Sequence, residues 1–470
     1  MKISFRNSAL FLVIIIGIFL EVWKINQFPI EQWDEARRGI NALGMIHGND
    51  YFNYSFVDQP DTFNTKPPLT IWLIAASFKF FGISNFSLRF HSIISIILFL
   101  YFFSRLILLY RDKVFAALAI GMIISVKGVI GFHVGRTGDT DSVLLLFLTA
   151  FLYYFLSYWD FGRKWAIFPA GLFFGLAFCT KSFAAFLVIP GVLVYMLLTD
   201  RKKILSKEIL AGGLFAFLII AGWTLFTMNG SRGTGTDQNM FQTMFNTDLV
   251  RRFTDNSFEA GFDLFYVFHV LDMSFNIWNY LLYLAGFIAL LRIIWFKKTA
   301  RLKQNKLVLL SLLIAAGYAI ILSLSMNKHR WYLAPAIPFF AILTTEFIYS
   351  HKDRYSWVLP AFLILFASLI IRKFVELNKP DQSVSVFFRD HSELLHQAGQ
   401  LLVDKNVSQD LVYEFVKYGY TKARLVDGLP ENQSGFVYFG PQPGSDTLQI
   451  RYKLNGNHLV TSDAEKILND

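Results

Sequence analysis

The stretch SALFLVIIIGIFLEVW, residues 8–23, is an apolar run that is soon followed by the charged segment IEQWDEARRGINALGMIHG, residues 30–48. An apolar run of about 18 residues is long enough to cross the roughly 30 Å hydrocarbon layer of a membrane. The run follows Lys2 and Arg6, as a signal peptide would, but it lacks a small-residue cleavage site. The sequence therefore predicts a retained first transmembrane helix with a charged cluster at its outer end.

Runs of this kind recur along most of the 470-residue chain, which is 54% hydrophobic, contains 51 phenylalanines and has a mean hydropathy of +0.44. This composition exceeds what one soluble core can hold and indicates an all-α polytopic membrane protein. The net charge of +10 lies in short loops between the runs, where it sets orientation, so we expect no nucleic-acid partner. The single cysteine, Cys179, cannot form an intramolecular disulfide.

The basic loops predict the orientation, because loops rich in Lys and Arg mark the cytoplasmic side. The segments LRIIWFKKTARLKQNK and TDRKKILSKE are strongly basic, whereas the loops 28–90 and 228–276 are acidic or mixed and are expected outside. About eleven spans, within a range of 11–13, satisfy this alternation. The expected spans are roughly 8–27, 90–109, 114–133, 142–159, 165–180, 184–198, 208–227, 277–295, 306–324, 332–349 and 355–371.

Two further segments complete the expected organisation. KPPLTIWLIAASFKFFG, residues 66–82, is short, begins with two prolines after Lys66 and contains Lys79, so it predicts an interfacial helix on the outer surface. A short tilted span is the alternative. The membrane domain is expected to end at residue 377, and residues 378–470 to form a small α/β domain outside. In this domain HSELLHQAGQLLVDK predicts a helix, and DLVYEFVKYG, GFVYFG and TLQIRYKL predict strands.

The expected outer face carries three charged clusters. Their members are Asp34, Glu35, Arg37 and Arg38; Lys66 in NTKPP; and Arg136, Asp139 and Asp141 in HVGRTGDTDSVLLLF. Ionisable residues near membrane depth are expensive and often mark function. For Asp141 alone, a favourable interaction with a helix N-terminus explains the position equally well. A carboxylate can take a proton from an attacking hydroxyl or amine, and Arg or Lys can bind phosphate oxygens. The clusters therefore suit transfer from a lipid-linked phosphate, with a transporter or flippase of lipid-linked sugars as the alternative.

Several segments, in the same order, closely resemble the bacterial membrane glycosyltransferases related to aminoarabinose transferase and protein O-mannosyltransferase. The resemblance covers roughly residues 8–350 and is weaker in the C-terminal part. It implies the C-type glycosyltransferase fold and a polyprenyl-phosphate sugar donor used on the periplasmic face. The matching segments are WDEARRGINALGMIHGNDYF, KPPLTIWLIAASFKFFGISNFSLRFHSII, RTGDTDSVLLLFLTAFLYYF, GLAFCTKSFAAFLVIPG and KHRWYLAPAIPFFAIL.

The resemblance also implies roles for individual residues. Asp34, in the DEAR motif, would be the catalytic base or orient the acceptor. Arg37 would organise the site by pairing with Asp141, and Lys66 would bind donor phosphate. Tyr332 follows the family pattern K-x-x-x-Y-x-x-P.

The chain departs from the aminoarabinose transferases at Thr65, where they have a glutamate implicated in metal binding with a histidine of the second long loop. His269 is the corresponding candidate, although a packed aromatic-rich stretch explains it as well. The need for a divalent metal is left open. Arg251 and Arg252 are candidates for phosphate contact, or a solvated pair.

The remaining candidates have simpler explanations beside the functional one. End-capping or snorkelling of a long side chain explains His133 and Lys181. Glu35 is expected to set a helix end and Arg38 to meet lipid head groups. Further candidate site residues are Asp139, Arg136, Lys328 and Arg330.

Together these observations predict a glycosyltransferase of the bacterial inner membrane, with its active site and C-terminal domain in the periplasm. The expected acceptor is a lipid-anchored glycan, such as lipid A, or a protein. The identity of the sugar does not follow from the sequence.

Overall fold

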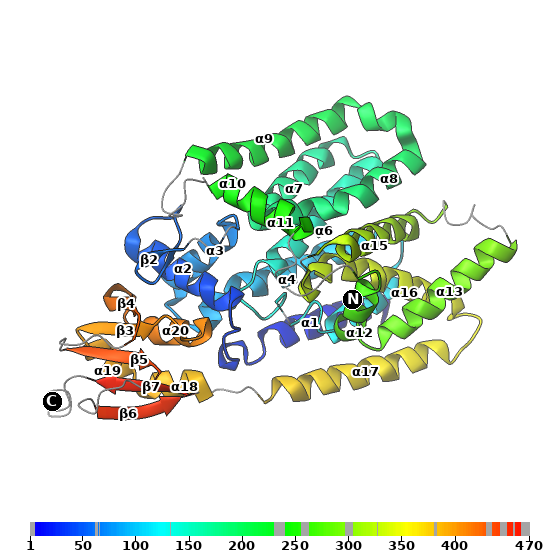
Figure 1. Ribbon diagram of the computed structural model, residues 1–470. Coiled ribbons are helices and arrows are strands. Elements are labelled where there is room, and N and C mark those ends of the chain that lie inside the picture. Colours follow the sequence, from blue (N-terminus) through cyan, green and yellow to red (C-terminus); the bar gives the residue numbers. More distant parts are fainter. Residues whose placement is uncertain are drawn as a thin grey trace.

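The computed structural model describes residues 5–61, 64, 66–131, 133–229, 240–254, 263–296, 304–326, 328–379, 383–428, 435–441, 449–454 and 456–461. In these residues long helices form a bundle, and a smaller α/β part lies at one end of it beside α2 and α3 (Figure 1). The helices of the first half are α1 (Phe5–Val22), α2 (Asp34–Gly48), α3 (Leu69–Phe81), α4 (Asn85–Ile107), α5 (Lys113–Ser125), α6 (Asp141–Trp159), α7 (Ile167–Lys181), α8 (Ile189–Asp200) and α9 (Lys207–Asn229).

The second half continues the bundle and then enters the α/β part. Its helices are α10 (Met240–Phe245), α11 (Arg251–Thr254), α12 (Tyr266–Ser274), α13 (Trp278–Phe296), α15 (Lys306–Leu324), α16 (Ile337–His351), α17 (Val358–Leu377), α18 (Ser383–Asp390), α19 (Ser392–Gln397) and α20 (Gln409–Val416). Short 3₁₀ segments are η1 (Ile25–Gln27), η2 (Lys164–Ala166), η3 (Ser182–Val188), η4 (Arg201–Leu205), η6 (Arg330–Ala336) and η7 (Tyr420–Lys422), and η5 (Asn246–Val250) is a π-helical turn.

The length and composition of the helices confirm a multi-pass membrane protein. Among the described residues, eight helical segments are long and apolar enough to cross a membrane. One of them, Lys164–Leu205, has 42 residues and contains both α7 and α8. The helices α3, α5 and α13 are apolar but shorter. Each of the eleven ranges expected from the sequence to span the membrane falls on one of these segments.

The helix ends follow local rules. The α4 helix begins with a capping box in which Ser84 and Ser87 satisfy each other's backbone N–H groups. Asp112 accepts a hydrogen bond from the N–H of Phe115 at the start of α5. The α2 helix ends at Asn49 in the left-handed region, with φ 51°. These caps place the starts of α4 and α5 without help from distant residues.

The range 114–133, expected to be one span, is helical only as far as Ser125. The chain then folds back through buried Val126, Val129 and Ile130. The loop is anchored because the N–H of Gly128 donates to the carbonyl of Ser274 at 3.1 Å. Apolarity alone could not separate this buried loop from a helix, which is why the sequence-based boundary was wrong.

The C-terminal part contains a mixed sheet of five strands in the order β4-β3-β5-β7-β6. Strand β3 pairs in parallel with β4 and β5, and β7 pairs antiparallel with β5 and β6. A short hairpin, β1 with β2, belongs to the first long loop. The strands are β1 (Ser55–Phe56), β2 (Gln59–Pro60), β3 (Gln400–Asp404), β4 (Ala423–Val426), β5 (Phe436–Gly440), β6 (Gln449–Leu454) and β7 (Asn457–Thr461).

Two expectations for this part are wrong. DLVYEFVKYG forms helix α20 instead of a strand, and the second half of HSELLHQAGQLLVDK forms strand β3 instead of a helix. Leu411 through Val416 are all buried, so this part of α20 is covered on every side. A short apolar run of this kind cannot be assigned by periodicity. The strands expected at GFVYFG and TLQIRYKL are present as β5 and β6.

The α/β part shares its core with α2 and α3. Buried side chains of α2, including Ile40 and Leu43, belong to the same apolar cluster as those of α20 and β3. The approach is close at Gly39, where a Cβ atom would lie 2.5 Å from the ring of Tyr413. The helix that begins at Asp34 is therefore held on one side by the C-terminal part.

Candidate functional site

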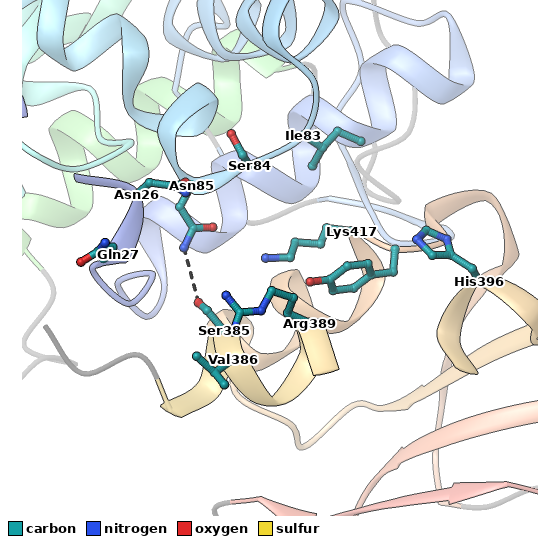
Figure 2. A pocket seen from close by; sticks show the side chains of 11 residues that line it. Asn26, Gln27, Ile83, Ser84, Asn85, Ser385, Val386, Arg389, His396 and Lys417 are labelled. Atoms are coloured by element: carbon teal, nitrogen blue, oxygen red, sulfur yellow. Dashed lines mark hydrogen bonds between the residues drawn. The ribbon is translucent and has the colours of Figure 1, made fainter. Parts of the chain in front are cut away.

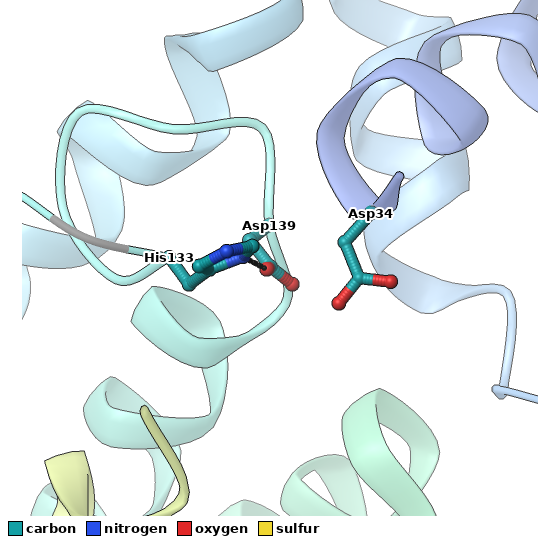
Figure 3. A group of neighbouring side chains, drawn as sticks. All are labelled: Asp34, His133 and Asp139. Carbon is teal, nitrogen blue, oxygen red and sulfur yellow. Dashed lines mark hydrogen bonds and ion pairs between the residues drawn. The ribbon is translucent and has the colours of Figure 1, made fainter. Parts of the chain in front are cut away.

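Asp34 is the first residue of α2, and its side chain is 37% exposed. Its carboxylate lies 3.7 Å from the guanidinium of Arg38, one turn further along the helix. Figure 3 shows the Asp34 carboxylate pointing toward His133 and Asp139, which come from the loop before α6. Asp34 is thus a half-exposed carboxylate that faces a second acidic residue.

Glu35, the next residue, is completely buried. Its carboxylate accepts two hydrogen bonds from Arg89 of α4, at 2.6 and 2.8 Å. It also accepts from the backbone N–H groups of Gly138 and Glu31, each at 2.7 Å. Glu35 therefore fixes the start of α2 against α4 and the loop before α6, which agrees with its expected role at a helix end.

Arg37 does not pair with Asp141, contrary to the expectation from the resemblance. Its guanidinium donates to both oxygens of Asp61, at 2.8 and 2.6 Å, and lies 4.8 Å from the centre of the Phe56 ring. Asn41 donates to the same carboxylate at 2.9 Å. Arg37 thus fastens α2 to the first long loop, through an aspartate that sequence reasoning did not single out.

Arg38 was expected to meet lipid head groups, and this expectation is wrong. The side chain is only 4% exposed, and its guanidinium lies 2.8 Å from a carboxylate oxygen of Asp139. Because the same guanidinium also reaches Asp34, Arg38 joins the first acidic cluster to the third. The spacing of residues 34 and 38 on one helix face was visible in the sequence, but the burial of Arg38 was not.

Asp139 is completely buried, and its carboxylate contacts several charged and hydrogen-bonding groups. Besides Arg38, the His133 ring contacts it at 2.7 Å, and the N–H of Thr140 donates to it at 2.6 Å. Burial alone would raise the pKa of Asp139, but Arg38, His133 and Lys181 hold that pKa well below its usual range. Asp139 is therefore a fixed anion rather than a proton acceptor.

His133 links this anion to Glu31 and to an aromatic stack. Its ring lies 3.4 Å from a carboxylate oxygen of Glu31 and stacks on Trp331 with ring centres 3.9 Å apart. Burial acts to lower the pKa of His133, but its hydrogen bond to Asp139 and the nearby acidic charges raise it to about 9. Burial raises the pKa of Glu31 to about 7. At neutral pH the imidazole is accordingly a cation.

Asp141, at the start of α6, pairs with a different partner from the one expected. Its carboxylate contacts the ammonium of Lys181, at the end of α7, at 2.5 Å, and both side chains are buried. The Lys181 ammonium lies 5.0 Å from the centre of the Tyr332 ring. The structure thus brings Asp141 together with two other residues singled out in the sequence, although end-capping or snorkelling was the simpler expectation for Lys181.

Lys66 forms an ion pair with Asp248, whose other oxygen accepts from Ser182 at 2.8 Å. Asp248 lies in η5, directly before α11, so Lys66 is joined to the second long loop that carries Arg251 and Arg252. The side chain of Arg251 is exposed. The side chain of Arg252 and the whole of Thr65 lie outside the described residues.

The three further candidates are Arg136, Lys328 and Arg330. Arg136 donates to the carbonyls of Leu20, Glu21 and Trp23 and so satisfies the end of α1. Lys328 donates to the carbonyl of Ser323 at 3.3 Å, and Arg330 begins η6 with an exposed side chain. Arg136 is therefore better explained as a helix cap than as a site residue.

Asp34, His133 and Asp139 could also hold a metal ion, since their ligand atoms lie within 4.8 Å of one another. His269, the candidate from the sequence, is 65% exposed and lies 3.4 Å from Asp263. The residue types of Asp34, His133 and Asp139 suit a divalent ion. However, the positive charges of Arg38 and of protonated His133 already balance the negative charge of Asp139. The group is complete as an ion-pair network, so we assign no step to a metal.

Comparisons with known proteins show which proteins this chain is similar to. Residues 65–226 match the family described as dolichyl-phosphate-mannose-protein mannosyltransferase. An undecaprenyl phosphate-alpha-4-amino-4-deoxy-L-arabinose arabinosyl transferase of Yersinia pestis is 24% identical over 58% of this chain and 49% of its own length. An uncharacterised protein of Aquifex aeolicus is 28% identical over 61% of this chain and 54% of its own. The aligned region spans about half the length of these curated relatives.

The similarity of fold extends over nearly the whole chain. ArnT from Cupriavidus metallidurans, solved bound to undecaprenyl phosphate, matches with a TM-score of 0.67 and 13% identity, over 98% of this chain and 99% of its own. The oligosaccharyltransferase of Archaeoglobus fulgidus matches with a TM-score of 0.58 and 12% identity, over 92% and 65% of the two chains. The chain is therefore related to the aminoarabinose transferases and protein mannosyltransferases, and it has the C-type glycosyltransferase fold.

Proposed function

We propose that the chain is a membrane glycosyltransferase that takes a sugar from a polyprenyl-phosphate donor. The observation that carries this proposal is the half-exposed Asp34 carboxylate, set beside the buried ion pair of Arg38 and Asp139. The relatives support the donor class, because ArnT was solved with undecaprenyl phosphate and the Yersinia relative is named for an undecaprenyl-phosphate sugar.

In the proposed reaction Asp34 accepts the proton of the acceptor hydroxyl or amine. The acceptor oxygen or nitrogen bonds to C1 of the sugar, the bond from C1 to the phosphate oxygen breaks, and the polyprenyl phosphate leaves with the electron pair. Asp34 suits the role of base because its carboxylate is accessible, whereas Asp139 and Asp141 are buried in ion pairs. Arg38 holds Asp34 in place at 3.7 Å.

The departing phosphate requires cations. Lys66, Arg251, Arg252 and Tyr332 are the proposed donor-phosphate contacts, and Arg330 is a further candidate. Lys66 is paired with Asp248, so a phosphate oxygen would share or replace that partner. An ammonium serves as a point charge that can turn from a carboxylate to a phosphate without a fixed geometry.

The proposed acceptor is a lipid-anchored glycan of the lipid A type or a protein, and the proposed location of the reaction is the periplasmic face of the bacterial inner membrane. The orientation rests on the basic segments, since residues 199–208 and 291–306 are joined to the helix ends remote from α2 and the sheet.

Purified protein in liposomes with a labelled polyprenyl-phosphate sugar tests the proposal. We expect release of unglycosylated polyprenyl phosphate together with label on the acceptor, and loss of both with Asp34→Asn. Movement of the intact donor across the bilayer without release would instead show a flippase. In that case the donor would stay intact with both the unaltered protein and Asp34→Asn.

A further inference from the structure

A cavity of about 550 Å³ lies between the membrane bundle and the C-terminal part, and Asp34 is not among its lining residues. Figure 2 shows Asn26, Gln27 and Asn85 on the bundle side and Ser385, Arg389 and Lys417 on the other side. Gln27 ends one candidate span and Asn85 begins another. Because two membrane-crossing segments end at its wall, the cavity lies at the level where lipid headgroups meet water.

The surface beside this cavity is apolar. Phe80 is 82% exposed, Phe81 53% and Ile83 39%, and Ile83 lines the cavity. The Phe81 ring packs on Phe90, with ring centres 4.7 Å apart. Large exposed aromatic side chains at a span end are typical of a surface that enters the lipid. The cavity is thus bordered by a membrane-contacting edge rather than by an ordinary aqueous surface.

The lining of the cavity is rich in donors. Arg389 and Lys417 are cationic, and among the described lining residues none is acidic. Lys417 pairs with the buried Glu414, and the Arg389 guanidinium lies 3.5 Å from the exposed Asp390. Each carboxylate uses only some of the N–H donors of its cation, because an ammonium has three N–H groups and a guanidinium has five. Phosphate oxygens are acceptors that match such donors.

The side-chain oxygen of Asn85 is a buried acceptor that a ligand could satisfy. Its side-chain nitrogen faces three acceptors, on Phe28, Ser385 and Glu414, at 3.4–3.5 Å, which sets the orientation of the amide. Its oxygen is buried and has no hydrogen-bond partner among the described residues, and the residue is only 4% exposed. A buried acceptor of this kind costs about 1–3 kcal/mol unless a donor reaches it. A hydroxyl group on a ligand in the cavity would supply that donor.

We propose that this cavity binds the headgroup of a membrane lipid that bears both a phosphate ester and a hydroxyl group, as a glycerol-phosphate or sugar-phosphate headgroup does. Arg389 and Lys417 receive the phosphate, Asn85 accepts from the hydroxyl, and the acyl chains lie along Ile83 and the phenylalanines of α3. The site is separate from the donor and acceptor groups proposed around Asp34, so its test reads binding and not sugar transfer.

Native mass spectrometry of the detergent-purified full chain tests the proposal with four ligands. We expect binding of phosphatidylglycerol, and weaker binding of phosphatidylethanol, which has the same phosphodiester without a hydroxyl group. We expect little binding of phosphatidylcholine. Inorganic phosphate alone should not bind measurably, and binding of free phosphate as tight as that of phosphatidylglycerol would overturn the assignment to a lipid.

Arg389→Ala and Arg372→Ala form a matched pair of variants. Both side chains are 68% exposed, and each lies 3.3–3.5 Å from one carboxylate, but Arg372 is on α17 and does not line the cavity. Loss of a charge-assisted phosphate contact weakens binding by about tenfold or more. We expect this loss for phosphatidylglycerol in Arg389→Ala only. Equal affinities in the two variants, or equal affinity for phosphatidylethanol and phosphatidylglycerol, would overturn the proposal.

Discussion

Asp34 and Glu35 are consecutive residues of α2, and a rotation of about 100° around the helix separates their side chains. This rotation leaves the Asp34 carboxylate 37% exposed and places that of Glu35 in complete burial against Arg89. The same rotation sends Arg37 to Asp61 and Arg38 to Asp139. The five residues 34–38 thus contribute one accessible carboxylate and three structural ion pairs.

Asp34→Asn should abolish transfer and leave the melting temperature unchanged. The amide preserves shape but cannot accept the acceptor's proton, and loss of a general base lowers the rate by about 10²–10⁴-fold. The measurement is the initial rate with a labelled donor, alongside thermal unfolding. Asp353→Asn is the control, because Asp353 is 88% exposed and pairs only with its neighbour Lys352 among its described contacts. A near-normal rate in a well-folded Asp34→Asn protein would refute the base assignment.

The stabilisation that protonated His133 gives the folded protein should be lost as the pH rises above neutrality. Its pKa of about 9 in the folded protein exceeds the ordinary value of 6.5. Its stabilisation is therefore complete below about pH 6.5 and is lost as the pH passes through 9, by about 3 kcal/mol at most. Thermal unfolding at pH 7 to 9.5 measures this slope.

His133→Gln should flatten the slope, because glutamine keeps a hydrogen-bonding group but does not titrate. Glu31, with a pKa of about 7, titrates mainly below this window and so contributes little to it. An unchanged slope in His133→Gln would assign the pH dependence to another group.

The sequence predicted which residues carry charge at the site but not how they pair. Asp34 and Lys66 were identified from a motif, whereas Asp61 and Asp248 had no pattern of their own and became partners only through folding. The choice of Arg37 over Arg38 as the partner of the third cluster also failed. Neighbouring positions on a helix differ in direction, and only the packing of α2 decides which of them faces inward.

At the scale of elements, α2 is held from two sides. Glu35 and Arg89 join it to α4, while Tyr413 of α20 lies against Gly39. The nearby hydroxyl of Tyr420 donates to the carbonyl of Val57 at 2.6 Å and lies 3.0 Å from the Ser55 hydroxyl. Asp34 therefore sits on a helix whose position depends on both parts of the chain.

Glu35→Gln should destabilise the protein strongly. It leaves the Arg89 charge buried without a countercharge, and removal of one partner of a buried ion pair costs about 3–5 kcal/mol. We expect a much lower melting temperature than for Asp34→Asn, measured in the same detergent. Comparable stabilities of the two variants would contradict the structural role of Glu35.

Lys66→Ala should lower kcat/KM for the lipid donor and leave KM for the acceptor nearly unchanged. A charge-assisted contact to phosphate contributes about 1.5–3 kcal/mol. Lys66→Arg should restore activity only in part, because a planar fork does not reproduce a point charge. Steady-state kinetics with both substrates varied provide the measurement. A defect confined to the acceptor KM would remove Lys66 from the donor site.

Long apolar helices could be predicted from the sequence, as α15 shows, because it coincides with the expected span 306–324. The start of α4 was missed, since its span was expected from residue 90 and the helix begins at Asn85. The exceptions were α20, which is buried on all sides, and the loop after Ser125, which is as apolar as a helix. Both are short and largely apolar, and a run of that kind cannot be assigned to a helix, a strand or a buried loop by periodicity alone.

At the scale of the whole molecule, α2 and the C-terminal sheet lie at the same end of the bundle (Figure 1). The proposed orientation places this end in the periplasm. Labelling with a membrane-impermeant thiol reagent, after Cys179→Ala, should therefore modify Asn49→Cys but not Lys202→Cys in intact cells. Both positions are exposed, so each should react after the membrane is permeabilised. The opposite pattern would invert the topology.

The overall architecture could be predicted because membrane-spanning length and loop charge constrain the chain strongly. The relation between the two parts could not. A boundary at residue 377 was expected from composition, yet the apolar core of the C-terminal part includes α2 and α3 from the first hundred residues. Contacts between segments so far apart leave no local trace in the sequence.

The close approach of Tyr413 to Gly39 limits how chains of this kind can diverge. An exchanged C-terminal domain would have to present a ring of matching shape to that one glycine, or the helix bearing Asp34 would shift. Gene fusion could therefore not exchange the C-terminal domain by itself. A chimera that joins this domain to another membrane domain should fail to fold unless α2 is transferred with it. We therefore expect α2 and the C-terminal sheet to be inherited together.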